Sequence, residues 1–451
     1  MPDTTNGETD VAQADEVPTP GGVALLGNGY KFAQDPVGAI EEFASHGDIV
    51  RFSFPGQSMY MVTGPSMIEE ILVTKHQQFS IGPAQTESFS GIADDAVTMS
   101  TGEKWQRLRR AIQPAFSGDT VESYRDRMRH EAAETVARWT DGEKIDLLEE
   151  TRRLTLRILA DTMLGIDIRG RESVVMDASD ALISRANFRR PGRFLPDWFP
   201  TSTDRRFERA VQRLDDFVAD CLADCEPDPD GADVSSVLLA ARERGALSRS
   251  EVRHNLVAML LAGNSSPAVT LTHAWRLLDE NPDIHERVLT EIETVTNGEY
   301  FAACVDDLEL TGNVLSETLR LFPPTTGVSR QATEPVTVGG HEFESGTQFL
   351  LPQWAPHRDE RFWDDPERFD PHRWERSSDR PEYAYFPFSG GPRFCPGMHF
   401  ARQEMILTLA TMVQQVDLAV EIEGELTFTP SMTLRPATDI TATVRRRGRY
   451  R

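Results

Sequence analysis

Cysteine is scarce in this chain of 451 residues, with only four copies. They stand at positions 221, 225, 304 and 395, and their spacing matches neither a disulfide framework nor the ligand pattern of a structural zinc site. We therefore expect reduced thiols and no disulfide scaffold. Cys395 alone among them stands in a glycine-rich segment.

Lysine is equally rare, because it occurs only at positions 31, 75, 104 and 144 and leaves arginine to make up the rest of the 47 basic residues. Aspartate and glutamate number 72, and the formal net charge is −25. Acid excess with few lysines is typical of proteins from salt-loving archaea, in which concentrated salt screens the repulsion between carboxylates. We expect a halophilic archaeal origin and no binding to nucleic acid, since phosphate contact requires a positive face.

Long hydrophobic runs are also missing, and the longest candidate, residues 257–263, is far shorter than the ~18 apolar residues of a membrane span. The acidic N-terminus lacks the basic and then apolar order of a signal peptide. We expect no membrane span and a cytoplasmic location. Residues 1–17 are predicted to form a disordered acidic tail, and residues 18–451 a single domain, because neither an internal repeat nor a shift in composition divides them.

The pattern of apolar residues is helical from residue 105 to about residue 297, with breaks at residues 190–203 and 226–233. Between residues 328 and 352 the period changes to two, which predicts a small sheet. Further short strands are predicted at residues 49–63 and after residue 423. A helix-rich chain with small separate sheets has an α+β fold.

The segment at residues 388–397 reads FSGGPRFCPG and places Cys395 between a turn-rich loop and a predicted helix. Pro396 suits a first helical position, so we expect Cys395 at the cap, where free N–H groups and the helix dipole lower the pKa of a thiol. Such a thiolate binds metals. The glycines would let a large flat ligand approach the backbone, with Phe388 packed on it. Haem iron fits this description.

This segment resembles the haem-binding signature of the cytochromes P450, F-x-x-G-x-R-x-C-x-G, on Phe388, Gly391, Arg393, Cys395 and Gly397. Chance matches to such a pattern are expected in well under ~1 in 1,000 chains of this size. The resemblance extends from about residue 18 to the end. It implies haem b as cofactor, Cys395 as the axial thiolate ligand of the iron, and cofactor contacts from Phe388, Arg393 and Gly397.

A helix about 45 Å long is predicted at residues 248–280. Its middle, residues 262–267, reads AGNSSP, and the proline interrupts the pattern because it leaves a backbone carbonyl without a donor. This stretch resembles the oxygen-binding segment A/G-G-x-D/E-T of the cytochromes P450, with Ser265 at the acid position and Ser266 at the threonine position. We expect Gly263, Ser265 and Ser266 to be catalytic, although a serine cannot act as the charged end of a proton relay.

Glu317 and Arg320 lie on one face of a predicted helix. In the family, such a Glu-x-x-Arg pair meets a further arginine from the segment before the cysteine, usually in F-x-P-x-R-F. Residues 369–374, FDPHRW, match that pattern except at the last position, which favours Arg373 over Arg368. We expect the network of Glu317, Arg320 and Arg373 to fix the conformation of the cysteine loop.

The same resemblance implies positive groups for the two haem propionates. Trp105 and Arg109 match the W-x-x-x-R of a helix that contacts the propionates, and at i and i+4 they share a helix face. Arg330, His357 and Arg393 are further candidates by their positions in matching segments.

The resemblance implies a haem-thiolate monooxygenase that activates O2 to hydroxylate a largely apolar small molecule. Electrons are expected from separate proteins, a ferredoxin-type donor and its reductase, because no flavin or iron–sulfur motif is present. Opposite charges favour docking of an acidic donor on a basic patch of Lys104, Arg107, Arg110 and Arg402. The missing acid at Ser265 leaves two alternatives open: a peroxide-driven or isomerising haem-thiolate enzyme, and a non-enzymatic haem sensor.

Overall fold

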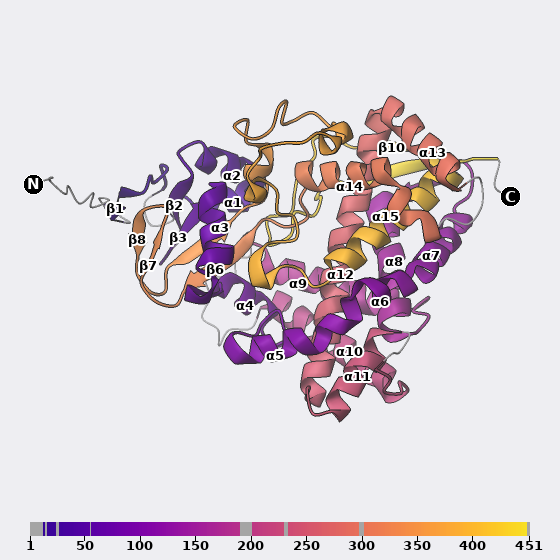
Figure 1. Cartoon of the computed structure of the whole chain (residues 1–451), viewed down its shortest axis with the longest axis horizontal. Helices are drawn as coiled ribbons and strands as arrows, with labels where there is room; N and C mark the ends of the chain where they lie inside the picture. Colours follow the sequence, from indigo (N-terminus) through magenta and orange to yellow (C-terminus); the bar gives the residue numbers. More distant parts are fainter. Residues whose placement is uncertain are drawn as a thin grey trace, which may run out of the picture.

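The computed structural model describes residues 12–13, 16–23, 27–54, 56–189, 201–229, 233–296 and 302–448. Helices fill one side of the molecule, and most strands lie at the side of the N-terminus (Figure 1). This arrangement confirms the expected α+β fold. The longer helices are α5 (Gly102–Ile112), α7 (Arg125–Arg138), α8 (Leu147–Leu159), α9 (Glu172–Ala186), α10 (Ser202–Ala223), α11 (Val234–Glu243), α12 (Arg249–Glu280), α13 (Pro282–Thr296), α14 (Glu309–Leu321) and α15 (Met398–Gln415).

Short helices connect these elements with the strands. They are α1 (Tyr30–Gln34), α2 (Pro36–Ala44), α3 (Pro65–Glu69), α4 (Pro83–Phe89) and α6 (Gly118–Ser123). One turn of π-helix, Glu70–Thr74, extends α3.

Three small sheets complete the described fold. The largest has the strand order β2-β3-β9-β6-β4, and the two others have the orders β1-β8-β7 and β10-β11-β5. Their strands are β1 (Ala12–Gln13), β2 (Ile49–Phe54), β3 (Gln57–Val62), β4 (Phe79–Ile81), β5 (Lys144–Asp146), β6 (Val328–Ala332), β7 (Val336–Val338), β8 (His341–Phe343), β9 (Gln348–Leu351), β10 (Val416–Ile422) and β11 (Ile440–Arg446).

The longest helix, α12, runs through the helical part of the molecule (Figure 1). It begins with a capping box, in which the Ser248 hydroxyl accepts from the Glu251 N–H and the Glu251 carboxylate accepts from the Ser248 N–H. The helix continues through its proline, where the sequence predicts an interruption. Contacts with α8 hold this stretch, because Thr155 donates to the Asn264 carbonyl at 3.0 Å and the Asn264 side chain donates to the Arg152 carbonyl at 2.7 Å.

The core is made of three groups of buried apolar side chains. The largest joins the helices, and the other two lie on the sheets at the N-terminal side. Phe322 packs against both the helical group and one sheet group, so the two are continuous at this point. The cysteine loop, residues 388–397, leads directly into α15 of the helical group.

The N-terminal tail expected at residues 1–17 lies mostly outside the described residues. Its described part is ordered, since Ala12 and Gln13 pair in parallel with His341 and Glu342 of β8. Val17 is buried in a sheet group of the core. This differs from the expected disorder. Burial of an apolar side chain stabilises the folded chain even when the segment around it is acidic.

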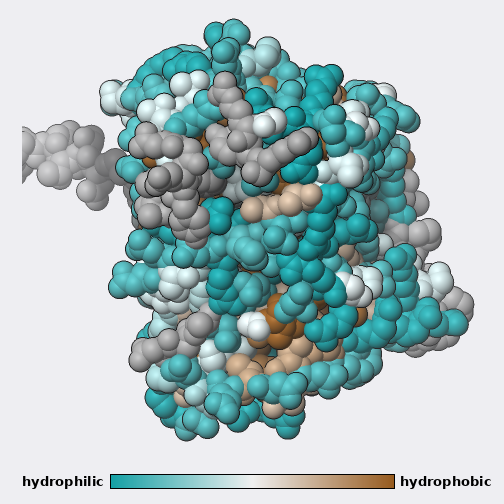
Figure 2. Space-filling view, turned by 90° about the vertical axis from the view of Figure 1, so that its right-hand side faces the viewer, coloured by the Kyte–Doolittle hydropathy of each residue, from teal (hydrophilic) through white to brown (hydrophobic). Residues whose placement is uncertain are grey.

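The surface agrees with the acidic composition. Figure 2 shows a largely hydrophilic face, on which hydrophobic residues are most evident in the lower part. Within the described ranges, Val23 is the one large hydrophobic side chain that is strongly exposed. Over the same ranges, no helix has the length and apolar character needed to cross a membrane.

Candidate active site

The cysteine loop is closed by a hydrogen bond of 2.9 Å from the Cys395 N–H to the Phe388 carbonyl. A turn follows, in which the Met398 N–H donates to the Cys395 carbonyl at 3.4 Å, and α15 begins only at Met398 with Gly397 as its N-cap. The prediction that Cys395 caps the helix is therefore wrong, because the turn takes up the two residues after the cysteine. Phe388 packs half-buried against the helical core.

The thiol of Cys395 also differs from its prediction. Burial raises its pKa, and the N–H of Gly397 and the positive charge of Arg109 only partly oppose this rise. The helix dipole is too distant to reverse the effect of burial, because the helix starts three residues later. The thiolate form therefore depends on a bound cation, since coordination to a metal deprotonates a thiol.

Two glycines of the cysteine loop are required by protein neighbours rather than by a ligand. A Cβ on Gly391, whose φ is +63°, would lie 1.9 Å from the Leu72 carbonyl oxygen. A Cβ on Gly390 would lie 2.4 Å from the ring of Tyr383. At Gly397, by contrast, the nearest atom of another described residue would be 3.8 Å away, so this glycine leaves room beside the cysteine.

Three arginines of the site have no carboxylate partner among the described residues: Arg109, Arg330 and Arg393. The Arg109 guanidinium donates to the Phe394 carbonyl at 3.1 Å and leaves its Nη2 buried without a partner. Arg330 is 7% exposed and donates to the Ser329 carbonyl. Burial and the charge of Arg393 lower the pKa of Arg330 to about 10.

Arg393 and Trp105 lie together in the same site. The Arg393 guanidinium stacks over the Trp105 ring at 4.5 Å and donates to the Ser100 carbonyl at 3.0 Å. Burial lowers the pKa of Arg393 to about 10. In a chain of net charge −25, one buried and two half-buried arginines without acids call for an anion from outside the chain. The two carboxylates of a haem fit this requirement.

His357, a further candidate for the propionates, lies elsewhere. Its ring is fully buried, and its Nε2 accepts from the Phe386 N–H at 3.0 Å. The charges that act on it are those of Arg320 and Arg358, and together with burial they lower its pKa to about 3. His357 is therefore neutral, and the structure does not bring it to Arg330 and Arg393.

The middle of α12 carries a stripe of accessible side chains. From Asn255 to Leu278, a stretch that the structure describes throughout, every residue is buried except four. These four follow the spacing of one helix face and are Met259, Ala262, Gly263 and Ser266. Ser266 is therefore accessible, whereas a Cβ on Gly263 would lie 3.0 Å from the Leu159 side chain of α8 and Ser265 is buried on another side of the helix.

Glu317 gathers the expected network in the buried interior. Its carboxylate accepts from Arg320 at 2.8 Å and from Arg373 at 2.8 Å, and Glu317 and Arg320 are fully buried. Arg368 contributes only its backbone carbonyl, which accepts from both of these arginines. Sequence reasoning missed Trp374, whose indole N–H donates to Glu317 at 3.0 Å. Its signal was the tryptophan that replaces phenylalanine at the end of FDPHRW.

Replacing Glu317 by glutamine should destabilise the fold by about 3–5 kcal/mol, because the two arginines would be left buried without a counter-charge. Trp374→Phe, which removes one hydrogen bond to a charged acceptor, should cost about 1.5–3 kcal/mol. Glu309→Gln, at an exposed position of the same helix, is the control and should change little. Chemical unfolding at constant salt measures these differences. Equal stabilities of the Glu317 and Glu309 variants would show that the network does not support the loop.

The comparisons with known proteins agree with this geometry. The family model "Cytochrome P450" matches residues 17–442. Cyclooctatin synthase of Streptomyces melanosporofaciens is 30% identical over 404 residues, which cover 87% of this chain and 88% of that protein. Pentalenene oxygenase of Streptomyces avermitilis is 30% identical over 418 residues, covering 90% and 92%. With this match over nearly its whole length, the chain belongs to the cytochrome P450 family of haem-thiolate monooxygenases.

Proposed function

We propose that Cys395 is the thiolate ligand of the haem and that Arg109, Arg330 and Arg393 bind its propionates. The observation that carries this proposal is the group of the buried Arg330 and the half-buried Arg109 and Arg393, which have no acid partner among the described residues beside the cysteine loop. When bound, a thiolate-ligated haem supplies the activation of O2 for insertion of oxygen into a C–H bond. The protein contributes charge neutralisation, the cysteine loop and the accessible stripe on α12.

The substrate proposed for this enzyme is an apolar hydrocarbon of the terpenoid kind. Relatives named pentalenene oxygenase and cyclooctat-9-en-7-ol 5-monooxygenase support this class. The accessible stripe on α12 supports it too, because Met259 and Ala262 offer apolar contact and Ser266 a single hydroxyl. Such a lining orients an apolar molecule by shape and leaves one polar group for the chemistry.

Ser266 is proposed to hold and pass a proton on the accessible stripe of α12. Its side chain lies on the accessible face, and its backbone carbonyl is already engaged by Thr270 at 3.0 Å. Ser265, which stands where the family has an acid, is 6% exposed and is not part of the stripe. Proton delivery is therefore assigned to the Ser266 hydroxyl and not to residue 265.

The electron donor is proposed to be an acidic ferredoxin, supplied by its own reductase. Of the four residues expected to form a basic patch, Lys104 pairs with Asp95 at 2.8 Å and Arg107 pairs with Glu251 at 2.5 Å. Two others, Arg110 and Arg402, are exposed and have no acidic partner in the described part of the chain. The patch is therefore smaller than the sequence suggests, and steering of the donor depends on these two arginines.

Cys395→Ser tests the ligand assignment. The ferrous–CO complex of the wild type should show the strongly red-shifted Soret band of thiolate ligation, and the variant should lose it because serine does not provide a thiolate. Cys221→Ser, which replaces a half-buried thiol on α10, is the matched control and should keep the band. The assignment would be wrong if the Cys395 variant kept the band and the Cys221 variant lost it.

Ser266→Ala tests the proton assignment. Product formed per NADH should fall severalfold and hydrogen peroxide should rise, because removal of a positioned proton donor slows the productive branch. Ser265→Ala, one residue away but buried, should leave the ratio almost unchanged. A peroxide-driven enzyme is the alternative that the missing acid favours. It would turn over with added peroxide, ignore NADH and reductase, and show no coupling change in Ser266→Ala.

The acidic, lysine-poor composition supports an origin in a salt-loving archaeon and work in a salt-rich cytoplasm. Carboxylates repel each other across a Debye length of ~30 Å at ~0.01 M salt but only ~3 Å at ~1 M. The thermal midpoint should therefore rise as potassium chloride is added to molar concentration. Choline chloride should have a similar effect, since screening depends on ionic strength. A midpoint that stays constant over this range would contradict the adaptation.

A further inference from the structure

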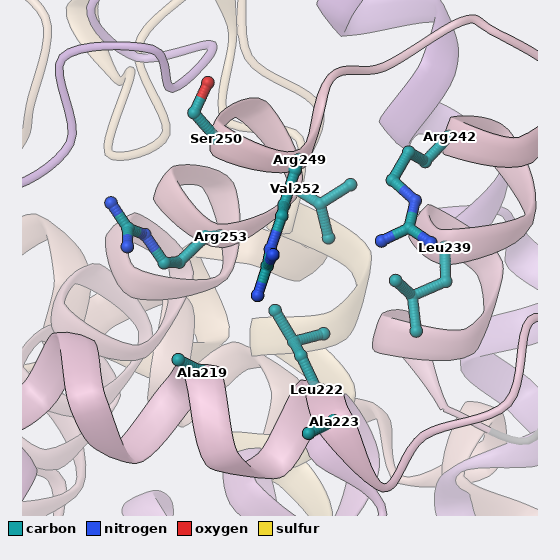
Figure 3. A pocket seen from close by; sticks show the side chains of 9 residues that line it. All are labelled: Ala219, Leu222, Ala223, Leu239, Arg242, Arg249, Ser250, Val252 and Arg253. Carbon is teal, nitrogen blue, oxygen red and sulfur yellow. The ribbon is translucent and has the colours of Figure 1, made fainter.

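A cavity of about 450 Å³ opens between α10, α11 and the first turn of α12. Aliphatic side chains form its floor, and arginines stand around it (Figure 3). None of its lining residues is acidic, although the chain has 72 aspartates and glutamates. The lining residues are Ala219, Leu222, Ala223, Leu239, Arg242, Arg249, Ser250, Val252 and Arg253.

Two of the three arginines are available to a ligand. Arg253 forms an ion pair with Asp215 at 3.5 Å, and Figure 3 shows that it points away from the other two. Arg242 and Arg249 are exposed, and no carboxylate of the described residues pairs with either. In Figure 3, Arg249 extends from α12 toward Leu222 on α10, while Arg242 leans from α11 into the space between the helices.

We propose that this cavity binds an amphipathic carboxylate, a medium-chain fatty acid, away from the haem site. The guanidinium groups of Arg242 and Arg249 match a carboxylate in charge and in planar geometry. Ala219, Leu222 and Ala223 of α10 offer the accessible aliphatic surface on which the alkyl chain leaves water, and the buried Leu239 and Val252 close the floor behind them. The volume lies in the range of small-molecule sites. An inorganic anion would contact only the arginines, and a neutral alcohol would contact chiefly the aliphatic floor. A fatty acid would contact both.

The proposal stands apart from the assignment of the haem site. Val252 precedes Gly263 by eleven residues, which is about 16 Å along the helix. Neither arginine of the cavity belongs to the group beside Cys395. Loss of one site would therefore leave the other intact, and the two can be tested separately.

Calorimetric titration of the holoprotein with decanoate tests the proposal, in the presence of saturating imidazole to occupy the haem. We expect binding of one decanoate that survives the imidazole. Decanol and inorganic phosphate should each bind at least tenfold more weakly. The double variant Arg242→Gln/Arg249→Gln should weaken decanoate at least tenfold, whereas Arg244→Gln, which changes an exposed arginine outside the cavity, should leave it within twofold.

Ala223→Phe provides an independent variant, because a ring at this exposed lining position would fill the floor and keep both arginines. It should abolish decanoate binding and leave the ferrous–CO spectrum unchanged. Three results would overturn the proposal: loss of decanoate binding in imidazole, equal affinity for phosphate and decanoate, or unchanged affinity in both the double variant and Ala223→Phe. Thermal midpoints equal to the wild type show that the variants are folded.

Discussion

The buried carboxylate of Glu317 joins α14 to the segment that precedes the cysteine loop. It accepts hydrogen bonds from Arg320, Arg373, Trp374 and the backbone N–H of Asp370, so both of its oxygens are satisfied without water. Removing such a group from water costs several kcal/mol, and only a fully bonded arrangement offsets that cost. The carboxylate therefore admits one placement of the segment that precedes the loop.

A continuous set of hydrogen bonds carries this placement to Cys395. Arg320 donates to the His357 carbonyl at 2.9 Å, and the His357 ring accepts from the Phe386 N–H at 3.0 Å. Phe386 stands two residues before Phe388, whose carbonyl receives the Cys395 N–H. This contact requires a neutral His357, because protonation of Nε2 would leave the Phe386 N–H without its acceptor. The low pKa of His357 keeps the ring neutral. His357 is thus a positioning residue for the loop.

The opposite electrostatic situation holds for the three arginines beside Cys395. Glu317 pairs its one negative charge with two arginines. Arg109, Arg330 and Arg393, in contrast, have no acid partner among the described residues. The chain has many carboxylates, but none of those described pairs with these three arginines. A buried charge without a partner raises the free energy of the folded protein, and no carboxylate of the described residues offsets this. This arrangement supports the proposal that the site takes a dianionic ligand.

Much of this could be predicted from the sequence, and the failures have physical causes. The spacing of Glu317 and Arg320 and the pattern around Arg373 predicted a network that depends on helix geometry and local motifs. The pKa of Cys395 and the role of His357 could not be predicted, because both depend on burial by segments distant in the chain. The reason for Gly391 was missed likewise, since its close neighbour Leu72 is more than 300 residues away in sequence.

The haem-dependent rise of the thermal midpoint in Arg330→Gln, compared with the wild type, tests the central claim most directly. If Arg330 is buried for the sake of a propionate, its removal relieves an unpaired charge, so the haem-free variant should be at least as stable as the haem-free wild type. The same variant should gain clearly less stability from haem. A haem-free variant that is less stable than the wild type but gains as much from haem would contradict the account.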